Sequence, residues 1–366
     1  MFNLNNILKM KYFNLMIVSC LIIILISCDN KEDNEIILTS GILISNEGLF
    51  GNGDGSISYF NDGNSEIIND LFLKVNERNL GDVVQSISIA GDNAYIIVNN
   101  SQKVEVVRIK RFKSIKTIYD LSYPRFFLQV SENKGYISNG SLNGKVYVVD
   151  LNNIEIIDSI NVGFGPEIIV KSGNHAFVAN SGGWGFDSTV SVIDISTNSV
   201  IQTVEVADIP VDIEIDYNGD IWVLCKGKVI YDFDTYEVIE ETASKLVQIS
   251  ALDYSIIYEI TIGQTGDTYN PSRLAIDKNK KVLFFTEVDG LYSINCENTN
   301  SSPSLICAKS FSGLEVDPND EIIYGFSTPS YTSSGFMYRY KYDGELIDSF
   351  AVGIGPNGAA FFTLQQ

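Results

Sequence analysis

The chain has 366 residues, of which 45% are hydrophobic and 19% charged, so it contains enough apolar material to bury a large core. Its formal net charge is −21 at pH 7, and a surface with this excess of carboxylates repels nucleic acid and anionic membranes. We therefore expect no nucleic-acid partner. Val, Ile, Tyr, Phe, Ser, Asn and Gly outweigh the helix formers, which favours strands and turns.

The N-terminal segment has the pattern of an exported lipoprotein. Residues 10–28 contain a short basic start, an apolar run and then the tetrapeptide LISC, a pattern typical of a signal peptide rather than a membrane helix. The tetrapeptide resembles a bacterial lipobox, in which Cys28 would accept the lipid. We expect residues 1–27 to be removed, with either Met1 or Met10 as the true start.

Residues 28–35 read as an acidic, lipidated tether. The stretch DNKEDNE after Cys28 resembles the signal that sends lipoproteins of one group of Gram-negative bacteria to the outer face of the outer membrane. The alternative is a plain solvated tether on a periplasm-facing anchor. In both cases we expect attachment to the membrane through the lipid alone.

From about residue 36 onward the sequence repeats a unit of about forty residues. Each unit contains a strand of alternating or continuous apolar residues, preceded by a hairpin with Gly, Asn or Asp at its turn. These strands, expected to be third in their units, are Ser56–Asp62, Lys103–Ile109, Lys145–Leu151, Thr189–Ile195, Lys245–Ala251, Gly290–Cys296 and Phe336–Tyr342. Most units open their innermost strand with a proline, namely Pro124, Pro166, Pro210, Pro271 or Pro356, and Val83 and Gly313 stand at the corresponding places in the other two.

Seven units of four strands predict an all-β fold, a seven-bladed β-propeller over residues 36–366. The last unit supplies a single strand, in Gly355–Gln366, and the opening stretch Gly41–Asn61 supplies strands without an innermost partner. We expect these N- and C-terminal strands to share one blade, because this arrangement closes the ring and leaves no free edge. A closed ring of this kind is expected to be monomeric.

Candidate binding residues come from loops that share one face of such a ring. The ends of the second strands would place Asn46, Asn99, Asn139, Asn180, Lys226, Glu287 and Ser327 around a rim. An amide both donates and accepts hydrogen bonds, which suits ligand recognition. The alternative is that each Asn caps a strand end or a turn.

Long loops between second and third strands add aromatic residues to the same face. They carry Phe50, Trp184, Phe186 and Tyr331, and the excursion Lys226–Ser244 adds Tyr231, Phe233 and Tyr236. Aromatic rings beside Gly, Ser and Asn suit flat organic ligands or sugars, and the alternative is that they pack on their own blades. Loops entering the innermost strands contribute Gln85, Tyr123, Arg125, Glu167, Asp212, Tyr269, Ser272, Arg273 and Asn357. Here the alternative is a structural network in which Arg125 and Arg273 pair with Glu167 and Asp212.

The sequence offers little support for catalysis, and we expect a protein that is not an enzyme and binds no cofactor or metal. His175, the single histidine, lies in a turn of the opposite face, which removes a Ser-His-Asp arrangement and a multi-histidine metal site. The GNGDG stretch near Asp54 lacks the acidic series of a calcium loop. The enzymatic alternative is a sugar-lactone hydrolase with Glu167, Asp212 and Asn357 as metal ligands.

Three cysteines lie in the repeat region. Cys296 and Cys307 flank a turn-like segment, so they either form a disulfide across a hairpin or remain two buried thiols. Cys225 has no obvious partner and is expected to pack in a core.

Three stretches carry a family resemblance. They are LISNEGLFGNGDGSISYF from Leu43, LGDVVQSISIAGDNAYIIVNNSQKVEVV from Leu80 and NPSRLAID from Asn270. They resemble the YncE-like surface β-propeller lipoproteins, and within that group the BtuG-type proteins, which bind cobalamin at the cell surface and pass it to an outer-membrane TonB-dependent transporter. The resemblance implies a corrinoid ligand and such a transporter as partner, but transfers no ligand-contact residue. A propeller that binds a glycan or a protein through the same face is the alternative.

Overall fold

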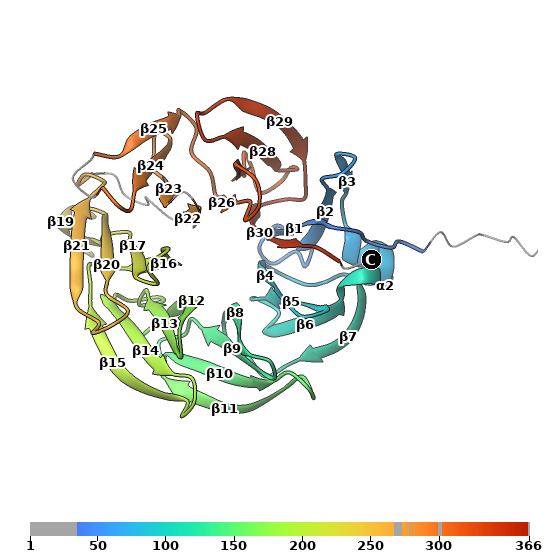
Figure 1. Ribbon diagram of the computed structural model, residues 1–366, viewed down its shortest axis with the longest axis horizontal. Helices are drawn as coiled ribbons and strands as arrows, with labels where there is room; N and C mark the ends of the chain where they lie inside the picture. Colours follow the sequence, from blue (N-terminus) through green and yellow to red (C-terminus); the bar gives the residue numbers. More distant parts are fainter. Residues whose placement is uncertain (1–34, 267–272, 278, 280, 299–301, 365–366) are drawn as a thin grey trace, which may run out of the picture. The chain divides into compact units, whose positions relative to one another are not determined.

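The computed structural model describes residues 35–266, 273–277, 279, 281–298 and 302–364. The chain divides into two compact units, Met1–Ile36 and Ile37–Gln366. The second unit contains every described strand and is a ring of seven four-stranded antiparallel sheets (Figure 1). The expected signal peptide, the tether up to residue 34 and Cys28 lie outside the described residues, as do Tyr269, Pro271 and Ser272.

The four strands of each blade follow one another from the channel outward, and the innermost strand is named first. Blade 1 comprises β30 (Pro356–Phe362), β1 (Gly41–Asn46), β2 (Ser56–Asn61) and β3 (Glu66–Ile68). Blade 2 comprises β4 (Val84–Ala90), β5 (Asn93–Val98), β6 (Lys103–Arg108) and β7 (Lys113–Ile118), and blade 3 comprises β8 (Pro124–Ser131), β9 (Lys134–Asn139), β10 (Lys145–Asp150) and β11 (Glu155–Asn161). Blade 4 comprises β12 (Pro166–Ser172), β13 (His175–Asn180), β14 (Thr189–Asp194) and β15 (Ser199–Glu205).

The remaining blades follow the same order. Blade 5 comprises β16 (Pro210–Ile215), β17 (Ile221–Cys225), β20 (Lys245–Ile249) and β21 (Ile256–Thr261). Blade 6 comprises β22 (Leu274–Asp277), β23 (Val282–Thr286), β24 (Leu291–Asn295) and β25 (Ser304–Cys307), and blade 7 comprises β26 (Gly313–Val316), β27 (Ile322–Ser327), β28 (Phe336–Lys341) and β29 (Leu346–Ala351).

Three further elements lie outside the blades. The short helix α2 (Leu71–Asn76) follows β3, and the 3-10 turn η1 (Ile109–Arg111) joins β6 to β7. The strands β18 (Val229–Tyr231) and β19 (Val238–Glu241) form a separate two-stranded hairpin between β17 and β20. No helix among the described residues is long and apolar enough to span a membrane.

The two ends of the propeller meet in blade 1, as the sequence predicts. β1 pairs antiparallel with β30 along its whole length, with Ile44 opposite Ala359, and β2 pairs with β1 on the other side. The ring is therefore closed by hydrogen bonds between strands that lie about three hundred residues apart in the chain. Each segment predicted to be a third strand occupies that position in its sheet.

The hydrophobic core lies between neighbouring blades. Second strands such as β17 are fully buried, whereas outermost strands such as β15 expose most of their residues. One cluster joins Phe177 and Val192 of blade 4 to Val223 of blade 5, and equivalent clusters fill five further junctions. Burial of this apolar surface is the main force that holds the blades together.

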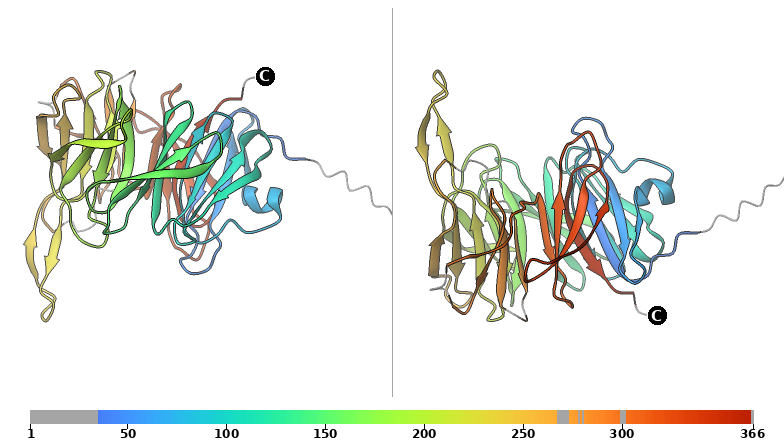
Figure 2. Two further views of the ribbon diagram at one scale, coloured as in Figure 1. Left: turned by 90° about the horizontal axis from the view of Figure 1, so that it is seen from below. Right: turned by 90° about the horizontal axis from the view of Figure 1, so that it is seen from above.

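The innermost strands give the ring two distinct faces. Four prolines begin innermost strands as predicted, at Pro124, Pro166, Pro210 and Pro356, and Gly313 begins β26 likewise. The predicted placement of Val83 is wrong by one residue, because Val84 begins β4. We call the face on which these strands begin the loop face, and the face on which they end the terminus face. The hairpin β18–β19 and the loop between β1 and β2 project from the same face of the ring, and the chain's C-terminal end leaves from the other (Figure 2). The excursion Lys226–Ser244 therefore precedes the third strand of its blade, as expected.

Candidate ligand-binding face

The loop face has a cavity of about 530 Å³ at the mouth of the central channel. The loop between β1 and β2 forms one wall, and residues entering β4 and β8 form another. Its lining is Glu47, Gly48, Leu49, Phe50, Val83, Gln85, Asn99, Tyr123, Arg125, Arg273 and Tyr331. Seven of these residues are ones that the sequence singles out, so the structure brings a large part of the predicted set to one place. We call this space the mouth cavity.

Exposed aromatic rings surround the mouth cavity. Phe50 is 75% exposed, Trp184 80% and Tyr331 48%, so these rings are not packed into their own blades. Trp184 lies beside Tyr123, with ring centroids 6.1 Å apart. Large apolar rings that remain exposed around a cavity are available to a ligand.

A charged network fixes the side chains at the floor of the mouth cavity. Arg125 donates from Nε to Glu167 Oε2 at 2.8 Å and from Nη1 to the Gln85 side-chain oxygen. Ser181 donates to the other oxygen of Glu167 at 3.3 Å. Burial lowers the pKa of Arg125, but the charge of Glu167 and the hydrogen bond to it outweigh this effect and leave the pKa raised. Arg125 is therefore a permanent cation, held in place by strands of three blades.

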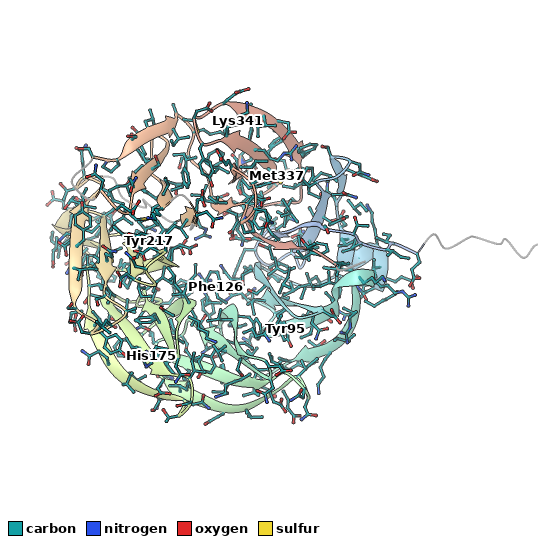
Figure 3. The ribbon with its side chains drawn as sticks, viewed as in Figure 1. Tyr95, Phe126, His175, Tyr217, Met337 and Lys341 are labelled. Carbon is teal, nitrogen blue, oxygen red and sulfur yellow. The ribbon has the colours of Figure 1, made fainter. Side chains whose placement is uncertain are left out.

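The central channel beneath the mouth holds two carboxyl groups with raised pKa values. Burial raises the pKa of Asp212 to about 6, although Arg273 and the amides of Leu274 and Ile213 oppose the rise. Burial likewise raises the pKa of Glu315 to about 8, and the charge of Asp212 adds to the rise. Both line a channel cavity of about 220 Å³ together with Arg273. Phe126 lies at the inner edge of the ring in the same lining (Figure 3).

A second cavity of the loop face lies between blades 4 and 5 and measures about 340 Å³. It joins the predicted residues Phe186, Lys226 and Tyr231 with the backbone turn at Gly183. Lys226 has a lowered pKa, because it is partly buried and lies near the cation Arg273. Beyond this cavity the hairpin β18–β19 continues outward, and its tip residues Phe233 and Tyr236 are 95% and 81% exposed.

Two strained backbone positions border these cavities. Val83 and Ile209, each directly before an innermost strand, have φ values of 55°. Gly165 and Gly355 have the same left-handed conformation at the corresponding places of blades 4 and 1. β-Branched residues rarely adopt it, and such strain is typical of functional sites. Val83 lines the mouth cavity and Ile209 the second cavity.

The predicted rim of Asn side chains requires a correction. Asn46 and Asn180 have no exposed surface and Asn139 is 2% exposed, so these amides lie beneath the loops. Asn139 accepts a hydrogen bond from the Tyr123 amide at 2.7 Å, and Asn180 donates to Ser191 at 3.0 Å. The interpretation of these three residues as ligand contacts is therefore wrong, and they stabilise strand ends and loops instead. Asn99 lines the mouth cavity, although its amide also donates to the Pro124 carbonyl.

Other predicted residues also have structural roles. Asn357 donates from Nδ2 to the carbonyls of Val84 and Gln85 and accepts from Ser45 at 2.6 Å, which ties blade 1 to blade 2. Asp212 accepts from the Leu274 amide at 2.9 Å and joins blade 5 to blade 6 in the same way. Glu287 is buried. No group of three His, Cys, Asp or Glu side chains suited to a metal occurs among the described residues.

No disulfide joins Cys296 to Cys307, and of the two alternatives the structure has the free thiols. Cys307 lies opposite Leu291 at the beginning of β24, whereas Cys296 follows the far end of that strand. The two residues are thus separated along the hairpin instead of facing each other across it. Cys225 is fully buried, as expected.

Sequence reasoning missed several residues of the site. Glu315 and Glu214 of the channel lie on innermost strands. Their signal in the sequence is an acidic residue within an otherwise apolar innermost strand. Leu49 and Val83 complete the wall of the mouth cavity, but neither stands out by residue type.

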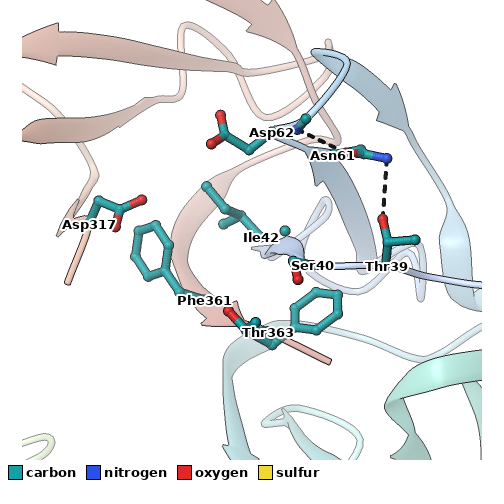
Figure 4. Close-up of a pocket in the computed structure, with 11 residues that line it drawn as sticks. Thr39, Ser40, Ile42, Asn61, Asp62, Asp317, Phe361 and Thr363 are labelled. Carbon is teal, nitrogen blue, oxygen red and sulfur yellow. Dashed lines mark hydrogen bonds between the residues drawn. The ribbon is translucent and has the colours of Figure 1, made fainter. Parts of the chain in front are cut away.

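The terminus face has a separate cavity of about 360 Å³ at the junction of blades 1 and 7. The residues around it include Thr39, Asn61, Asp62, Asp317 and Phe361 (Figure 4). Asp62 accepts a hydrogen bond from Arg339 at 2.7 Å, and Asn61 donates to Thr39 at 3.4 Å. No residue predicted from the sequence to contact a ligand lines this cavity.

Solved structures with a similar fold come from several proteins. A quinonprotein alcohol dehydrogenase-like protein of Bacteroides thetaiotaomicron matches with a TM-score of 0.65 at 13% identity over 86% of this chain and 78% of its own. A putative 6-phosphogluconolactonase of Bacteroides fragilis matches with a TM-score of 0.63 at 12% identity over 91% of this chain and 100% of its own. Hydrazine synthase of Kuenenia stuttgartiensis matches with a TM-score of 0.60 at 13% identity over 84% of this chain and 96% of its own. At these identities the likeness shows the fold alone.

No curated protein matches the sequence. The model of one protein family does match, over residues 40–352, and this range covers almost the whole propeller. The chain therefore belongs to the family described as domain of unknown function DUF5074.

Proposed function

We propose that the protein is a ligand-binding propeller that captures a corrinoid in the mouth cavity of its loop face. The observation that carries the proposal is the mouth cavity itself, in which exposed Phe50 and Tyr331 stand around Arg125 and Arg273, with exposed Trp184 just outside beside the lining residue Tyr123. A flat macrocycle fits between aromatic rings, and an anionic group fits beside a guanidinium.

The chemistry of a corrinoid matches this set of side chains. Its ring is flat and apolar on its faces, its edge carries amides, and its nucleotide loop carries a phosphodiester. Gln85 and Asn99 offer amide groups at the cavity wall, and Arg273 offers a cation. Because a corrinoid is larger than this cavity of about 530 Å³, part of it would remain above the mouth, among the exposed aromatic rings.

The cellular setting of the proposal rests on the N-terminal sequence. Lipidation at Cys28 would anchor the protein to the outer membrane, facing the cell exterior, where a TonB-dependent transporter would receive the ligand. The propeller would hold this ligand without changing it chemically. The resemblance to BtuG-type proteins supports the ligand class and the transporter.

Calorimetric titration of the unlipidated chain with cyanocobalamin tests the proposal. A chain that begins at residue 29 is suitable, because all seven sheets lie within residues 41–362 and the buried hydrophobic residues within 38–362. We expect saturable one-to-one binding that weakens at least tenfold in Trp184→Ala and in Phe50→Ala. Tyr119→Ala is the matched control, since Tyr119 is 62% exposed and does not line the mouth cavity. Absence of heat and of co-elution on gel filtration would reject the corrinoid.

One observation favours a second candidate, a propeller that binds a protein or glycan. The hairpin β18–β19 extends from the loop face with Phe233 and Tyr236 almost fully exposed at its tip. A double variant, Phe233→Ser with Tyr236→Ser, separates the two functions. If the second candidate is correct, this variant loses binding to a glycan array or to a partner protein, whereas the Trp184→Ala variant retains it.

A further inference from the structure

One segment of this acidic protein is strongly basic. Residues 108–116 read RIKRFKSIK, with five basic residues, no acidic residue and hence a formal charge of +5, in a chain whose net charge is −21. All five basic side chains are exposed; they are Arg108, Lys110, Arg111, Lys113 and Lys116. We call these five residues the basic surface.

Local structure explains why these charges point outward. Ile109 and Phe112 are buried, at 1% and 0% exposure, and anchor the turn η1 to blade 2. Phe112 adopts a left-handed conformation with φ of 53°, which turns the chain from η1 into β7. The basic residues on either side of these anchors are therefore held at the surface.

Contacts of three basic residues leave most of their charge in place: one acidic side chain pairs with Arg108, whereas carbonyl groups hold Lys113 and Lys116. Arg108 pairs with Asp92 at 3.4 Å. Both side chains are exposed, so the ion pair is screened by water and contributes little free energy. Lys116 donates to the carbonyl of Asn153 at 3.0 Å, and Lys113 donates to the carbonyl of Val75. A carbonyl positions an ammonium group but leaves its charge in place.

The basic surface lies on the face opposite the mouth cavity. Arg108, Lys110 and Arg111 line a cleft of about 740 Å³ together with Ile89, Gly91, Asp92, Ile109 and the C-terminal residues 361–364, so three basic side chains and one acidic side chain face it. Val83 and Gln85, at the other end of the same innermost strand β4, line the mouth cavity. The strand runs from one face to the other, so the basic surface belongs to the terminus face.

The chain enters the propeller at the basic surface. The Leu38 amide donates to the Lys110 carbonyl at 2.9 Å, and Ile37 beside it is 53% exposed. Leu38 is the tenth residue after Cys28, and ten extended residues span at most about 36 Å. A lipid on Cys28 would therefore keep the basic surface close to the bilayer that holds the lipid.

We propose that the basic surface docks the propeller on an anionic lipid bilayer. The net charge predicts repulsion from such a membrane, but the field near a surface is set by the charges closest to it. Each Lys or Arg near an anionic bilayer adds about fivefold to the affinity, and one acyl chain with a polybasic segment gives stable anchoring. Docked in this way, the protein directs its loop face away from the bilayer. The inference does not depend on the ligand of the mouth cavity.

Cosedimentation with lipid vesicles tests the inference, using the unlipidated chain from residue 29. One set of vesicles contains phosphatidylcholine alone, and the other contains phosphatidylcholine with about a third phosphatidylglycerol. We expect binding to the anionic vesicles, with loss at high salt because the charges are screened. The variant R108Q/K110Q/R111Q should bind at least tenfold more weakly, and Lys110→Gln alone about fivefold more weakly.

The variant K245Q/K281Q/K341Q is the matched control, because it removes the same charge from blades 5, 6 and 7. We expect it to bind within twofold of the parent chain, and all variants to keep the parent's melting temperature. Equal binding of the parent to both vesicle types would overturn the proposal, and so would equal losses in the two triple variants. Capture on heparin without binding to vesicles would identify an acidic polysaccharide as the partner and reject the bilayer.

Discussion

Arg125 and Glu167 form an ion pair at the mouth of the channel, with Nε and Oε2 2.8 Å apart. Arg125 lies on β8 and Glu167 on β12, so the pair joins the innermost strands of two neighbouring blades. Their side chains are 20% and 13% exposed, so water screens the pair only partly. A structural network of such ion pairs is the alternative to ligand contact expected from the sequence, and for Arg125 and Glu167 that network exists. The pair holds Arg125 at the floor of the mouth cavity.

Removal of Arg125 should therefore destabilise the propeller. Arg125→Met leaves Glu167 without its cation, which should lower the free energy of unfolding by about 1–3 kcal/mol. Urea denaturation measures this value. Lys245→Met is the control, because its pair with Glu259 is more exposed and should contribute less than about 1 kcal/mol. Equal effects of the two substitutions would contradict a structural role for the Arg125–Glu167 pair.

The exposed aromatic residues should affect binding but not stability. Phe50 and Trp184 are 75% and 80% exposed, so their substitution by Ala removes little packing. We expect melting temperatures within about 2 °C of the parent. Differential scanning fluorimetry of the same variants used for the cyanocobalamin titration measures this. A large fall in melting temperature would show that the rings serve the fold.

The channel carboxyl groups predict that stability falls as pH rises. The pKa of Glu315 is raised to about 8 in the folded state from an ordinary value near 4.5, so the folded chain binds more protons than the unfolded chain between these values. The contribution of Glu315 to the free energy of unfolding should therefore be greatest below about pH 4.5 and should decline up to about pH 8. The slope of this decline is at most about 1.4 kcal/mol per pH unit. Asp212, with a pKa of about 6, should add to the decline between about pH 4 and 6.

Glu315→Gln isolates this effect. The amide cannot ionise, so the variant should gain stability relative to the parent as pH rises from 5 to 8. Urea midpoints at several pH values measure the difference. A difference that stays constant with pH would contradict the raised pKa of Glu315.

The three cysteines of the propeller should all be free thiols. Burial raises the pKa values of Cys225 and Cys296 to about 12, so a thiol reagent at pH 8 should not modify either in the native chain. Cys307 is half-buried and also has a pKa raised by burial, so it should react slowly. After denaturation without reductant, the chain from residue 29 should release three equivalents. One equivalent would show a disulfide.

The architecture was accessible to sequence reasoning because it repeats. Apolar and polar residues alternate in third strands such as Lys145–Leu151, and this pattern recurs in successive units. The C-terminal end of the chain supplies a single strand and the N-terminal end supplies strands without an innermost partner, which predicts the pairing of β30 with β1. Clustering of Phe50 and Tyr331 on one face follows from the same repeat, because equivalent loops lie on the same side of a propeller.

The side-chain environment of the site was less accessible. Asn46 and Asn180 end their strands as expected, but whether an amide at that position turns outward or beneath the loop depends on neighbours such as Ser58 and Ser191. The register between β24 and β25 places Cys307 opposite Leu291, five residues before Cys296, and residue types do not reveal this register. The net charge likewise gives no sign of the basic surface, because a sum over all charged residues does not say where in the chain they lie.

Hydrogen exchange of the protein with and without cyanocobalamin tests the central claim most directly, because it locates the ligand on the ring. Binding in the mouth cavity predicts added protection in peptides that cover residues 47–50, 123–125, 181–186 and 327–331, with no change at residues 89–92 and 361–364 on the terminus face. Absence of any added protection, or protection confined to the terminus face, would contradict the assignment of the mouth cavity as the ligand site.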